Sequence, residues 1–332
     1  MENRPGLDPA VAEVRRAVRG ALAPLPAGST VVVALSGGAD SLALTAAVGF
    51  EGRKLGLRLA SVTVDHGLQP GSAEVAENAG RQAASLGVDP LIVRVEVGTD
   101  GGPEAAARAA RYRVLADAAL DVGAAAVLVG HTLDDQAETV LLGLSRGSGA
   151  RSLQGMAARS ELAPGVMLVR PLLDVRRTTT LAACAAEGLA PWSDPHNNEP
   201  RFSRVRVRNR VLPVLEAELG PGIAEALART AAQLREDAEA FDEMIDETIE
   251  DIVEHAEAGI SVSVPALAAN PAALRHRIIR HVVAAEFGQS LSRAQTLEVA
   301  RLVTDWSGQT AIDLPGCRAR RVGARLEFTA QP

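Results

Sequence analysis

Two glycines and two serines follow the first apolar run of the chain, in the segment 36–41 with the sequence SGGADS. Glycines after a strand let the backbone approach a ligand, and the N–H groups at the start of a following helix attract an anion. Asp40 would repel a phosphate unless a cation lay between them, which predicts a Mg²⁺ ion bridging this carboxylate and a pyrophosphate. The segment lacks the Gly-Lys-Ser/Thr of a Walker A loop and the third glycine of a dinucleotide fingerprint. It therefore predicts a phosphate loop of another kind, and the alternative is a plain strand-to-helix turn capped by a serine.

A second group consists of three carboxylates, Asp134, Asp135 and Glu138, which follow another apolar run. Their spacings of three and four residues put them on one face of a helix. Such a group can bind a cationic amine and accept its proton. The alternative is structural, because Thr132 and Asp135 have the spacing of a capping box and acids stabilise the first turn of a helix. We expect one of the acids to be a cap, and Asp135 and Glu138 to be the functional pair.

A third group is a run of five arginines within ten residues of a chain whose net charge is −7. They are Arg201, Arg204, Arg206, Arg208 and Arg210. Clustered arginines release counterions from a polyanion, so the run predicts a phosphate-binding patch, and Phe202 beside it can stack on a splayed base. A surface helix paired with the acids of a second domain is the alternative.

Four further residues can contact a nucleotide. Arg108 and Arg111 are three apart on one predicted helix, where they can hold a triphosphate or the charge that develops at its α-phosphate. His66 and His131 each follow a predicted strand and are expected beside a nucleotide. The structural alternatives are a solvated helix face for the arginines and loop stabilisation for the histidines.

The elements that must position these groups alternate along the first half of the chain. Apolar runs predict strands, and amphipathic stretches between them predict helices, which is typical of a parallel sheet covered on both faces. The predicted strands are 30–35, 58–64, 91–95, 126–129 and 166–169. The predicted helices are 41–50, 72–86, 103–122 and 134–144. The second half predicts a long helix over 223–257, two shorter ones over 271–287 and 292–304, and strands near 310–314 and 325–328.

The length of 332 residues predicts two domains, and we expect residues 1–218 to form the α/β domain and 219–332 a smaller, mainly helical one. No apolar run is long enough to predict a membrane span, and no secretory signal is visible. Only two cysteines occur, Cys184 and Cys317, which favours a reducing cytoplasm. No protein partner is implied, and the sequence leaves a monomer and a homodimer open.

The segment SGGADS carries the signature of the PP-loop ATP pyrophosphatases, and five further motifs distinguish the members of that superfamily. They are VDHGL at 64–68, ARAARY at 107–112, GHTLDDQAET at 130–139 with RGSG at 146–149, RPLL at 170–173, and DPHN at 194–197 with the arginine run. In this order the six motifs closely resemble the tRNA(Ile)-lysidine synthase family over about residues 28–215. The segment IDLPG at 312–316 is similar, more weakly, to the C-terminal region of that family.

The resemblance implies a PP-loop fold of the adenine nucleotide α-hydrolase type and a ligase that uses ATP and Mg²⁺. The wobble cytidine of a tRNA(Ile) with a CAU anticodon is adenylated at its C2 oxygen, pyrophosphate leaves, and L-lysine displaces AMP to form lysidine. The implied catalytic residues are Asp40, Arg108, Arg111, Asp135 and Glu138. The implied ATP-binding residues are Ser36, Gly37, Gly38, Ala39, Asp40, Ser41, His66 and His131. The implied lysine-binding residues are Asp134, Asp135 and Glu138. The implied tRNA-binding residues are Arg146, Asn197, Arg201, Phe202, Arg204 and Arg208.

The chain departs from the family pattern at two positions, His196 where serine is usual and Val205 where asparagine is usual. A PP-loop tRNA thiolase is the main alternative function, but sulfur transfer needs several reactive thiols and the two cysteines are far apart in sequence. An amide ligase and a non-catalytic RNA-binding protein are further alternatives. The arginine run would have no purpose in the amide ligase, and the complete loop and acid pair argue against the RNA-binding protein.

Overall fold

The structure is a computed structural model that describes residues 6–67, 71–95, 103–147, 149–194, 199–256 and 259–331. The chain forms two compact units, Met1–Leu234 and Arg235–Pro332. The division falls inside the 30-residue helix α10 (Ile223–Ile252), whereas the boundary expected after residue 218 lies at the end of the preceding helix α9 (Leu212–Leu219).

A six-stranded sheet with the order β3-β2-β1-β4-β6-β5 forms the centre of the first unit. The strands are β1 (Thr30–Ala34), β2 (Arg58–Asp65), β3 (Asp89–Arg94), β4 (Ala124–Leu128), β5 (Arg159–Ala163) and β6 (Val166–Val169). All neighbours pair in parallel except β5, which runs antiparallel to β6 at one edge. The five predicted strands are confirmed. The edge strand β5 was not predicted, because its sequence RSELA contains no apolar run.

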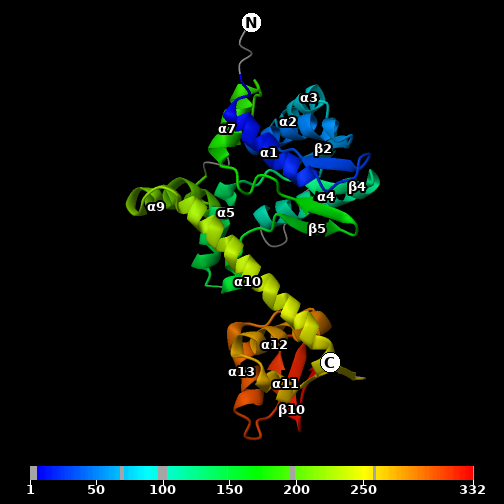
Figure 1. The fold of residues 1–332 in the computed structure, drawn as a ribbon, viewed down its shortest axis with the longest axis vertical. Helices are drawn as coiled ribbons and strands as arrows, with labels where there is room; N and C mark the ends of the chain where they lie inside the picture. Colours follow the sequence, from blue (N-terminus) through cyan, green and yellow to red (C-terminus); the bar gives the residue numbers. More distant parts are fainter. Residues whose placement is uncertain are drawn as a thin grey trace. The chain divides into compact units, whose positions relative to one another are not determined.

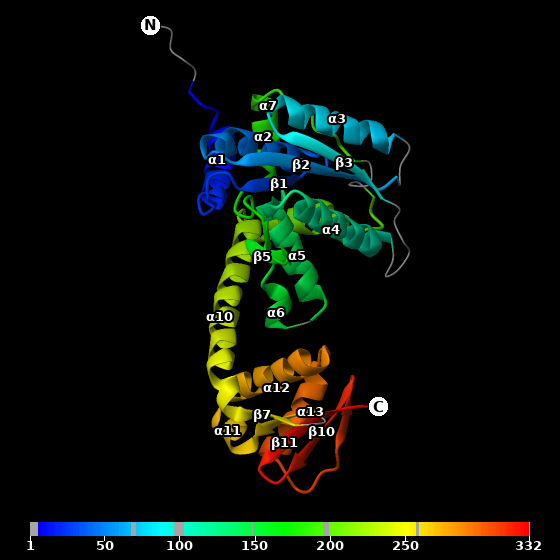
Figure 2. The same ribbon diagram turned by 90° about the vertical axis from the view of Figure 1, so that its right-hand side faces the viewer.

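Helices cover both faces of this sheet, as Figures 1 and 2 show. The helices on one side are α1 (Pro9–Leu22), α2 (Ala39–Lys54), α3 (Ser72–Ser85) and α7 (Arg177–Ala186). Helix α4 (Pro103–Asp121) covers the other side. The side chains of β1 alternate between two cores: Val31 and Val33 pack with α1, α2 and α7, whereas Val32 packs with α4. This alternation follows from the pleat of a strand that is buried on both faces.

Besides α7, further helices lie along the chain between β4 and α10. They are α5 (Leu133–Ser145), α6 (Ala150–Leu153), α8 (Ser203–Arg206), the π-helical turn η2 (Val207–Val211) and α9. The arginine run thus forms helix and not strand, in agreement with the helical interpretation of its spacing.

The second unit contains an antiparallel sheet of five strands with the order β7-β8-β11-β10-β9. The strands are β7 (Val253–Ala256), β8 (Gly259–Ser263), β9 (Ile312–Leu314), β10 (Cys317–Val322) and β11 (Arg325–Ala330). The helices α11 (Val264–Ala269), α12 (Ala272–Phe287) and α13 (Arg293–Thr304) pack on it around a core that includes the fully buried Phe328. The predicted class, an α/β unit followed by a smaller, mainly helical one, is confirmed, and the smaller unit also contains a five-stranded sheet where only two strands were predicted. The long helix ends five residues earlier than predicted, because the chain turns into β7 after Ile252.

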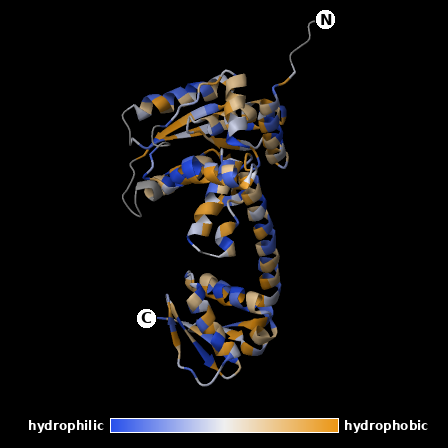
Figure 3. Cartoon of the chain, turned by 90° about the vertical axis from the view of Figure 1, so that its left-hand side faces the viewer, coloured by the Kyte–Doolittle hydropathy of each residue, from blue (hydrophilic) through white to orange (hydrophobic). Residues whose placement is uncertain are grey.

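In Figure 3, where hydrophobic residues are orange and hydrophilic residues blue, apolar residues are concentrated on the central strands of the first unit, whereas most helices carry residues of both kinds. Among the described residues, no helix combines the length and the apolar character that crossing a bilayer requires.

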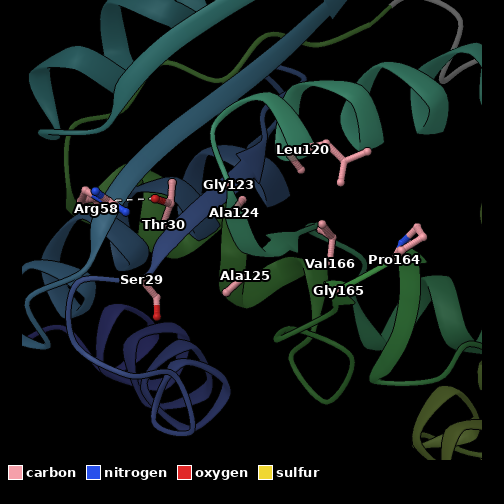
Figure 4. A pocket seen from close by; sticks show the side chains of 11 residues that line it. Ser29, Thr30, Arg58, Leu120, Gly123, Ala124, Ala125, Pro164, Gly165 and Val166 are labelled. Carbon is pink, nitrogen blue, oxygen red and sulfur yellow. Dashed lines mark hydrogen bonds between the residues drawn. The ribbon is translucent and has the colours of Figure 1, made fainter.

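A cavity of about 330 Å³ lies at the amino ends of β1, β2, β4 and β6 (Figure 4). Ser29, Thr30 and Arg58 line it, and the Arg58 Nε donates to the Thr30 Oγ1 at 3.1 Å. Parallel α/β sheets bind ligands at the opposite, carboxyl ends of their strands. The predicted site residues follow those carboxyl ends, so the candidate site lies away from this cavity.

Candidate active site

The phosphate loop joins the end of β1 to the first turn of α2. Gly37 has a φ of +83°, a left-handed conformation that favours glycine, and its carbonyl accepts a hydrogen bond from the Trp192 N–H at 2.9 Å. Gly130, which follows β4, lies against the loop: a Cβ at this position would come within 3.0 Å of the Asp40 backbone. Glycine at both positions therefore gives the loop its turn and lets the next strand end pack directly against it.

Two serines hold the loop in shape. The Ser41 hydroxyl donates to the Gly38 carbonyl at 2.9 Å and accepts from the Ser36 N–H at 3.2 Å. Gly38 is the N-cap of α2 and has no side chain with which to cap it. The first N–H groups of α2 consequently face the loop without a side-chain acceptor from their cap, as an anion site requires.

The predicted capping box is present at the start of α5. The Asp135 Oδ2 accepts from the Thr132 N–H at 2.9 Å and from its hydroxyl at 3.0 Å. Asp134 instead caps α7, because its Oδ2 accepts from the Arg177 N–H at 2.7 Å. Two of the three acids therefore stabilise helix ends. Asp135 does so through its Oδ2, while its Oδ1 accepts from Arg177.

Arg177, at the start of α7, connects the phosphate loop to the carboxylates of α5. Its Nε donates to the Asp40 Oδ2 at 3.2 Å, its Nη2 to the Asp135 Oδ1 at 2.9 Å and its Nη1 to the Glu138 Oε1 at 3.3 Å. The Thr180 hydroxyl donates to the other oxygen of Asp40. One guanidinium thus ties three acids from two elements into one cluster.

Two arginines of the run complete this cluster. The Arg204 Nε donates to the Glu138 Oε2 at 3.0 Å, and its Nη2 donates to the Thr139 hydroxyl at 2.7 Å. The Arg208 Nε donates to the Glu138 Oε1 at 2.6 Å, and its Nη2 contacts both Glu138 Oε2 at 3.0 Å and Asp135 Oδ1 at 3.4 Å. The side chain of Glu138 is fully buried among these groups. We use the name "ionic cluster" below for Asp40, Asp135, Glu138, Arg177, Arg204 and Arg208.

Burial and neighbouring opposite charges shift the pKa values of the ionic cluster in opposite directions. Burial raises the pKa of Asp40 above its ordinary value, and the nearby Arg177 only partly offsets this. For Asp135, burial also favours the neutral form, but Arg177 and the Thr132 N–H outweigh it and hold its pKa below the ordinary value. The pKa of Arg177 is raised, because Asp135 and Asp40 outweigh the effect of burial. Asp135 is therefore a carboxylate at neutral pH, and Arg177 is a cation.

The two predicted histidines are neutral at physiological pH. Burial, together with the charge of Arg170, lowers the pKa of His131 to about 4 although Asp135 acts in the other direction. Burial and the charge of Arg111 lower the pKa of His66. Both ring nitrogens of His66 and the Nδ1 of His131 are buried without a hydrogen-bond partner among the described residues. Such orphaned nitrogens suit neighbours of a bound polar molecule.

The remaining predicted residues lie on the surface or outside the described residues. Arg108 lies over the ring of Tyr112 on α4. Arg201 is exposed, with its guanidinium 4.8 Å from the centre of the Phe202 ring, and Arg146 is exposed at the C-terminal end of α5. Asn197 and the unusual His196 lie outside the described residues.

Arg177 and Thr180 were not among the predicted site residues. They lie one turn apart at the start of α7. A cation such as Arg177 is ordinarily unfavourable there, because the N-terminal end of a helix carries a partial positive charge. That unfavourable position is the signal that could have singled out Arg177.

Family models match both units. A model described as a PP-loop domain matches residues 12–215, and one described as the TilS substrate binding domain matches residues 263–327. A tRNA(Ile)-lysidine synthase of Leifsonia xyli subsp. xyli is 57% identical over 92% of this chain and 91% of its own length. One of Thermobifida fusca is 51% identical over 95% and 96%.

The chain belongs to the tRNA(Ile)-lysidine synthase family. The family predicted from the six motifs is thus confirmed, and with it an enzyme of the ligase class with a PP-loop domain that uses ATP.

A solved structure resembles the fold of the chain. It is the U34-tRNA thiolase NcsA from Methanococcus maripaludis with its [4Fe-4S] cluster, which has a TM-score of 0.59, is 21% identical, and covers 68% of this chain and 80% of its own. At this identity the likeness concerns the fold alone. The thiolase alternative is not favoured, because the relatives of high identity are lysidine synthases and because both cysteines are buried, Cys184 in the first unit and Cys317 in the second.

Proposed function

We propose that this chain ligates L-lysine to C2 of the wobble cytidine of a tRNA(Ile) with a CAU anticodon. ATP adenylates the C2 oxygen of the cytidine and pyrophosphate leaves; the amine of lysine then attacks C2 and displaces AMP. The observation that carries the proposal is the ionic bridge through Arg177, which joins the phosphate loop to Asp135 and Glu138. A nucleotide on the loop and an amine on the acids would lie side by side.

The phosphates of ATP would bind at the loop 36–41, whose hydroxyls and N–H groups suit an anion at a helix N-terminus. Arg108 and Arg111 of α4 would neutralise the charge that develops at the α-phosphate. The neutral His66 and His131, with their orphaned nitrogens, would contact the nucleotide.

Asp40 would hold Mg²⁺. The described residues contain no group of three metal-ligating side chains, but Mg²⁺ often takes one or two carboxylates and completes its shell with phosphate oxygens and water. A single carboxylate beside a phosphate loop fits that donor set. The ion would neutralise charge on the departing pyrophosphate.

Lysine needs a group that accepts its proton, because an amine of ordinary pKa near 10.4 is charged at neutral pH. Holding it neutral costs about 4 kcal/mol at pH ~7.4 unless the site assists. Asp135 has a lowered pKa and Glu138 is fully buried, so both suit a cationic amine. We assign the ammonium group to these two acids, with Asp134 beside them, and the proton transfer to one of them.

The tRNA would bind along the arginine run. Arg201 and Phe202 are paired in a cation–π contact that can rearrange to stack on a splayed base. Arg146 and Asn197 would contact the same RNA, and Arg204 and Arg208 would reach it from the ionic cluster. We place the reaction in the cytoplasm, in keeping with two free, buried cysteines.

The experiment that tests this function is incubation of the protein with CAU-anticodon tRNA(Ile), ATP, Mg²⁺ and isotope-labelled lysine, followed by mass analysis of the nucleosides. We expect labelled lysidine, and ATP–pyrophosphate exchange that only this tRNA stimulates. Exchange without the tRNA, or an unmodified cytidine, would contradict the proposal. A control with a tRNA of another anticodon tests whether the cytidine is the acceptor.

A further inference from the structure

Glu138 has no acceptor capacity left for a substrate. A carboxylate offers about four lone-pair positions, and Glu138 receives one N–H from Arg177, one from Arg204 and two from Arg208. Its side chain is fully buried within these contacts. An incoming ammonium group can therefore reach Glu138 only when an arginine leaves it.

Asp135 is saturated in the same way. Its Oδ2 accepts two hydrogen bonds from Thr132, and its Oδ1 accepts from Arg177 and Arg208. Asp40, by comparison, has only Thr180 and Arg177 as hydrogen-bond partners among the described residues. Lysine bound to Asp135 and Glu138 thus competes with the protein's own cations.

The charges of the ionic cluster balance, with three carboxylates against three guanidinium groups. Adding a lysine ammonium to a buried, balanced cluster would leave an uncompensated positive charge, which is costly in a low dielectric. Withdrawal of one arginine would restore the charge balance and, at the same time, free acceptor positions on the carboxylates.

Arg208 is the arginine whose withdrawal opens both acids. Arg177 belongs to α7 and also ties Asp40, while Arg204 is additionally bound to the Thr139 hydroxyl and the Asp135 carbonyl. All the hydrogen bonds of the Arg208 side chain in the described part of the chain go to the carboxylates of Asp135 and Glu138.

The segment that carries Arg208 has a second face suited to RNA. Arg206 and Arg210 are exposed on it, whereas Arg204 and Arg208 are partly buried against α5. The segment passes from α8 into the π-helical turn η2, a form of helix that occurs mostly as single-turn bulges inside α-helices and is frequent at functional sites. Phosphates on the outer face would therefore act on the same short element as the inner contacts.

The geometry points to Arg208 as a positioning residue that keeps Asp135 and Glu138 closed to lysine until tRNA engages the segment α8–η2. Lysine then binds tightly only to the tRNA-loaded enzyme, and by linkage lysine tightens tRNA binding by the same factor. This inference rests on the proposed function, since it takes lysine and tRNA as the ligands.

The test is binding of radiolabelled lysine by equilibrium dialysis, with and without CAU-anticodon tRNA(Ile) and without ATP, so that no turnover occurs. For the wild type we expect lysine to bind about tenfold more tightly when the tRNA is present. For Arg208→Gln we expect the tRNA-free enzyme to bind lysine about as tightly as the loaded wild type, so that the effect of tRNA disappears. A structural role alone would not raise lysine affinity.

Two further variants make the test specific. Arg229→Gln removes an exposed arginine of α10 and should keep the wild-type dependence on tRNA. Arg208→Lys keeps the positive charge but cannot donate two parallel hydrogen bonds as a guanidinium does, so its lysine affinity should depend on tRNA to an intermediate degree. If a thermal melt shows that Arg208→Gln does not fold, the lysine variant is used for the test in its place.

The inference is overturned if lysine affinity of the wild type is the same with and without tRNA, or if Arg208→Gln leaves it unchanged or weakens it in the free enzyme. Lysidine formation by the wild type in the same preparation separates the two proposals. If lysidine forms and the affinities do not respond, only the role of Arg208 fails; if no lysidine forms, the proposed function fails.

Discussion

Arginine–carboxylate pairs occur in both units, but they lie in different surroundings. In the first unit Arg204 and Arg208 are 29% and 27% exposed, and both contact a Glu138 side chain that is 0% exposed. In the second unit Arg318 and Arg320 on β10 are 54% and 56% exposed and pair with Asp313 and Glu327. The same chemical pair is therefore buried and shared in one unit, and solvated and isolated in the other.

The difference shows that the number of ion pairs says little about how much they contribute to the stability of the fold. An exposed pair contributes about 0–1 kcal/mol, because water and salt screen it. Removing one partner of a buried pair costs about 3–5 kcal/mol, because the other charge is left without compensation. We expect the ionic cluster to respond strongly to substitution, and the pairs on β10 to respond weakly.

Glu138→Ala should have the largest effect on stability. It leaves three guanidinium groups facing an empty space, so we expect the free energy of unfolding of the first unit to fall by about 3–5 kcal/mol. Urea unfolding followed by fluorescence measures this, since Trp192 lies in the first unit and Trp306 in the second. A loss below about 1 kcal/mol would mean that the cluster is solvated in solution.

Asp135→Ala should slow lysine transfer by about a hundredfold, the lower part of the range for a general base, and adenylation by less. Single-turnover assays that follow pyrophosphate release and lysidine formation separately measure the two steps. Equal losses in both steps would reject the assignment of Asp135 to lysine.

Gly130→Ala should weaken the use of ATP without unfolding the protein. The added Cβ would lie within 3.0 Å of the Asp40 backbone, which shifts the phosphate loop, and we expect tRNA-stimulated ATP–pyrophosphate exchange to fall about tenfold. Gly20→Ala is the matched control, because nothing lies within 4 Å of a Cβ there. Wild-type exchange in Gly130→Ala would show that the loop tolerates the contact.

Acid should destabilise the first unit through His131. Its pKa is about 4 in the folded chain against an ordinary 6.5, so the unfolded chain binds more protons between these values and stability falls as the pH drops from about 6.5 to about 4. Between pH 7 and pH 5 we expect a loss of about 1–2 kcal/mol that is smaller in His131→Gln. Urea midpoints from Trp192 at the two pH values measure it, and equal losses in both proteins would contradict the assignment.

Glu327→Ala should have the smallest effect. It removes the carboxylate on β11 that pairs with Arg320, whose side chain is 56% exposed, and we expect the free energy of unfolding of the second unit to change by less than about 1 kcal/mol. Unfolding followed at Trp306 in low and high salt checks this. A loss as large as that of Glu138→Ala would remove the distinction between the two regions.

The features that were predicted correctly are those that depend on residues close together in the chain. The five apolar strands, the loop at 36–41 and the capping box at Asp135 follow from residue types at short spacing, and each is present in the structure. Helix α1 was not predicted although its signals are there: Asp8 is its N-cap, Pro9 follows, and Val11, Val14 and Val18 form its buried stripe.

What the sequence could not predict depends on tertiary contact. The spacing of Arg204 and Arg208 correctly puts them on one helix face, but only packing shows that this face meets Glu138. The strands β7 and β8 lie where the long helix was expected to end and in the chain that follows it. They pair with each other, and β8 also pairs with β11 far along the chain. Partners of this kind lie beyond the range of a periodicity argument.

Both thiols of the chain are chemically quiet. Cys184 lies behind the phosphate loop, its Sγ donating to the Ala39 carbonyl at 3.3 Å, and burial raises its pKa to about 11; burial also raises the pKa of Cys317. Maleimides react with thiolates, so neither native cysteine should take up such a reagent under mild conditions. A cysteine engineered on the outer face of η2 would then accept a fluorophore or spin label selectively, giving a direct optical or magnetic readout of that element in the otherwise unaltered chain.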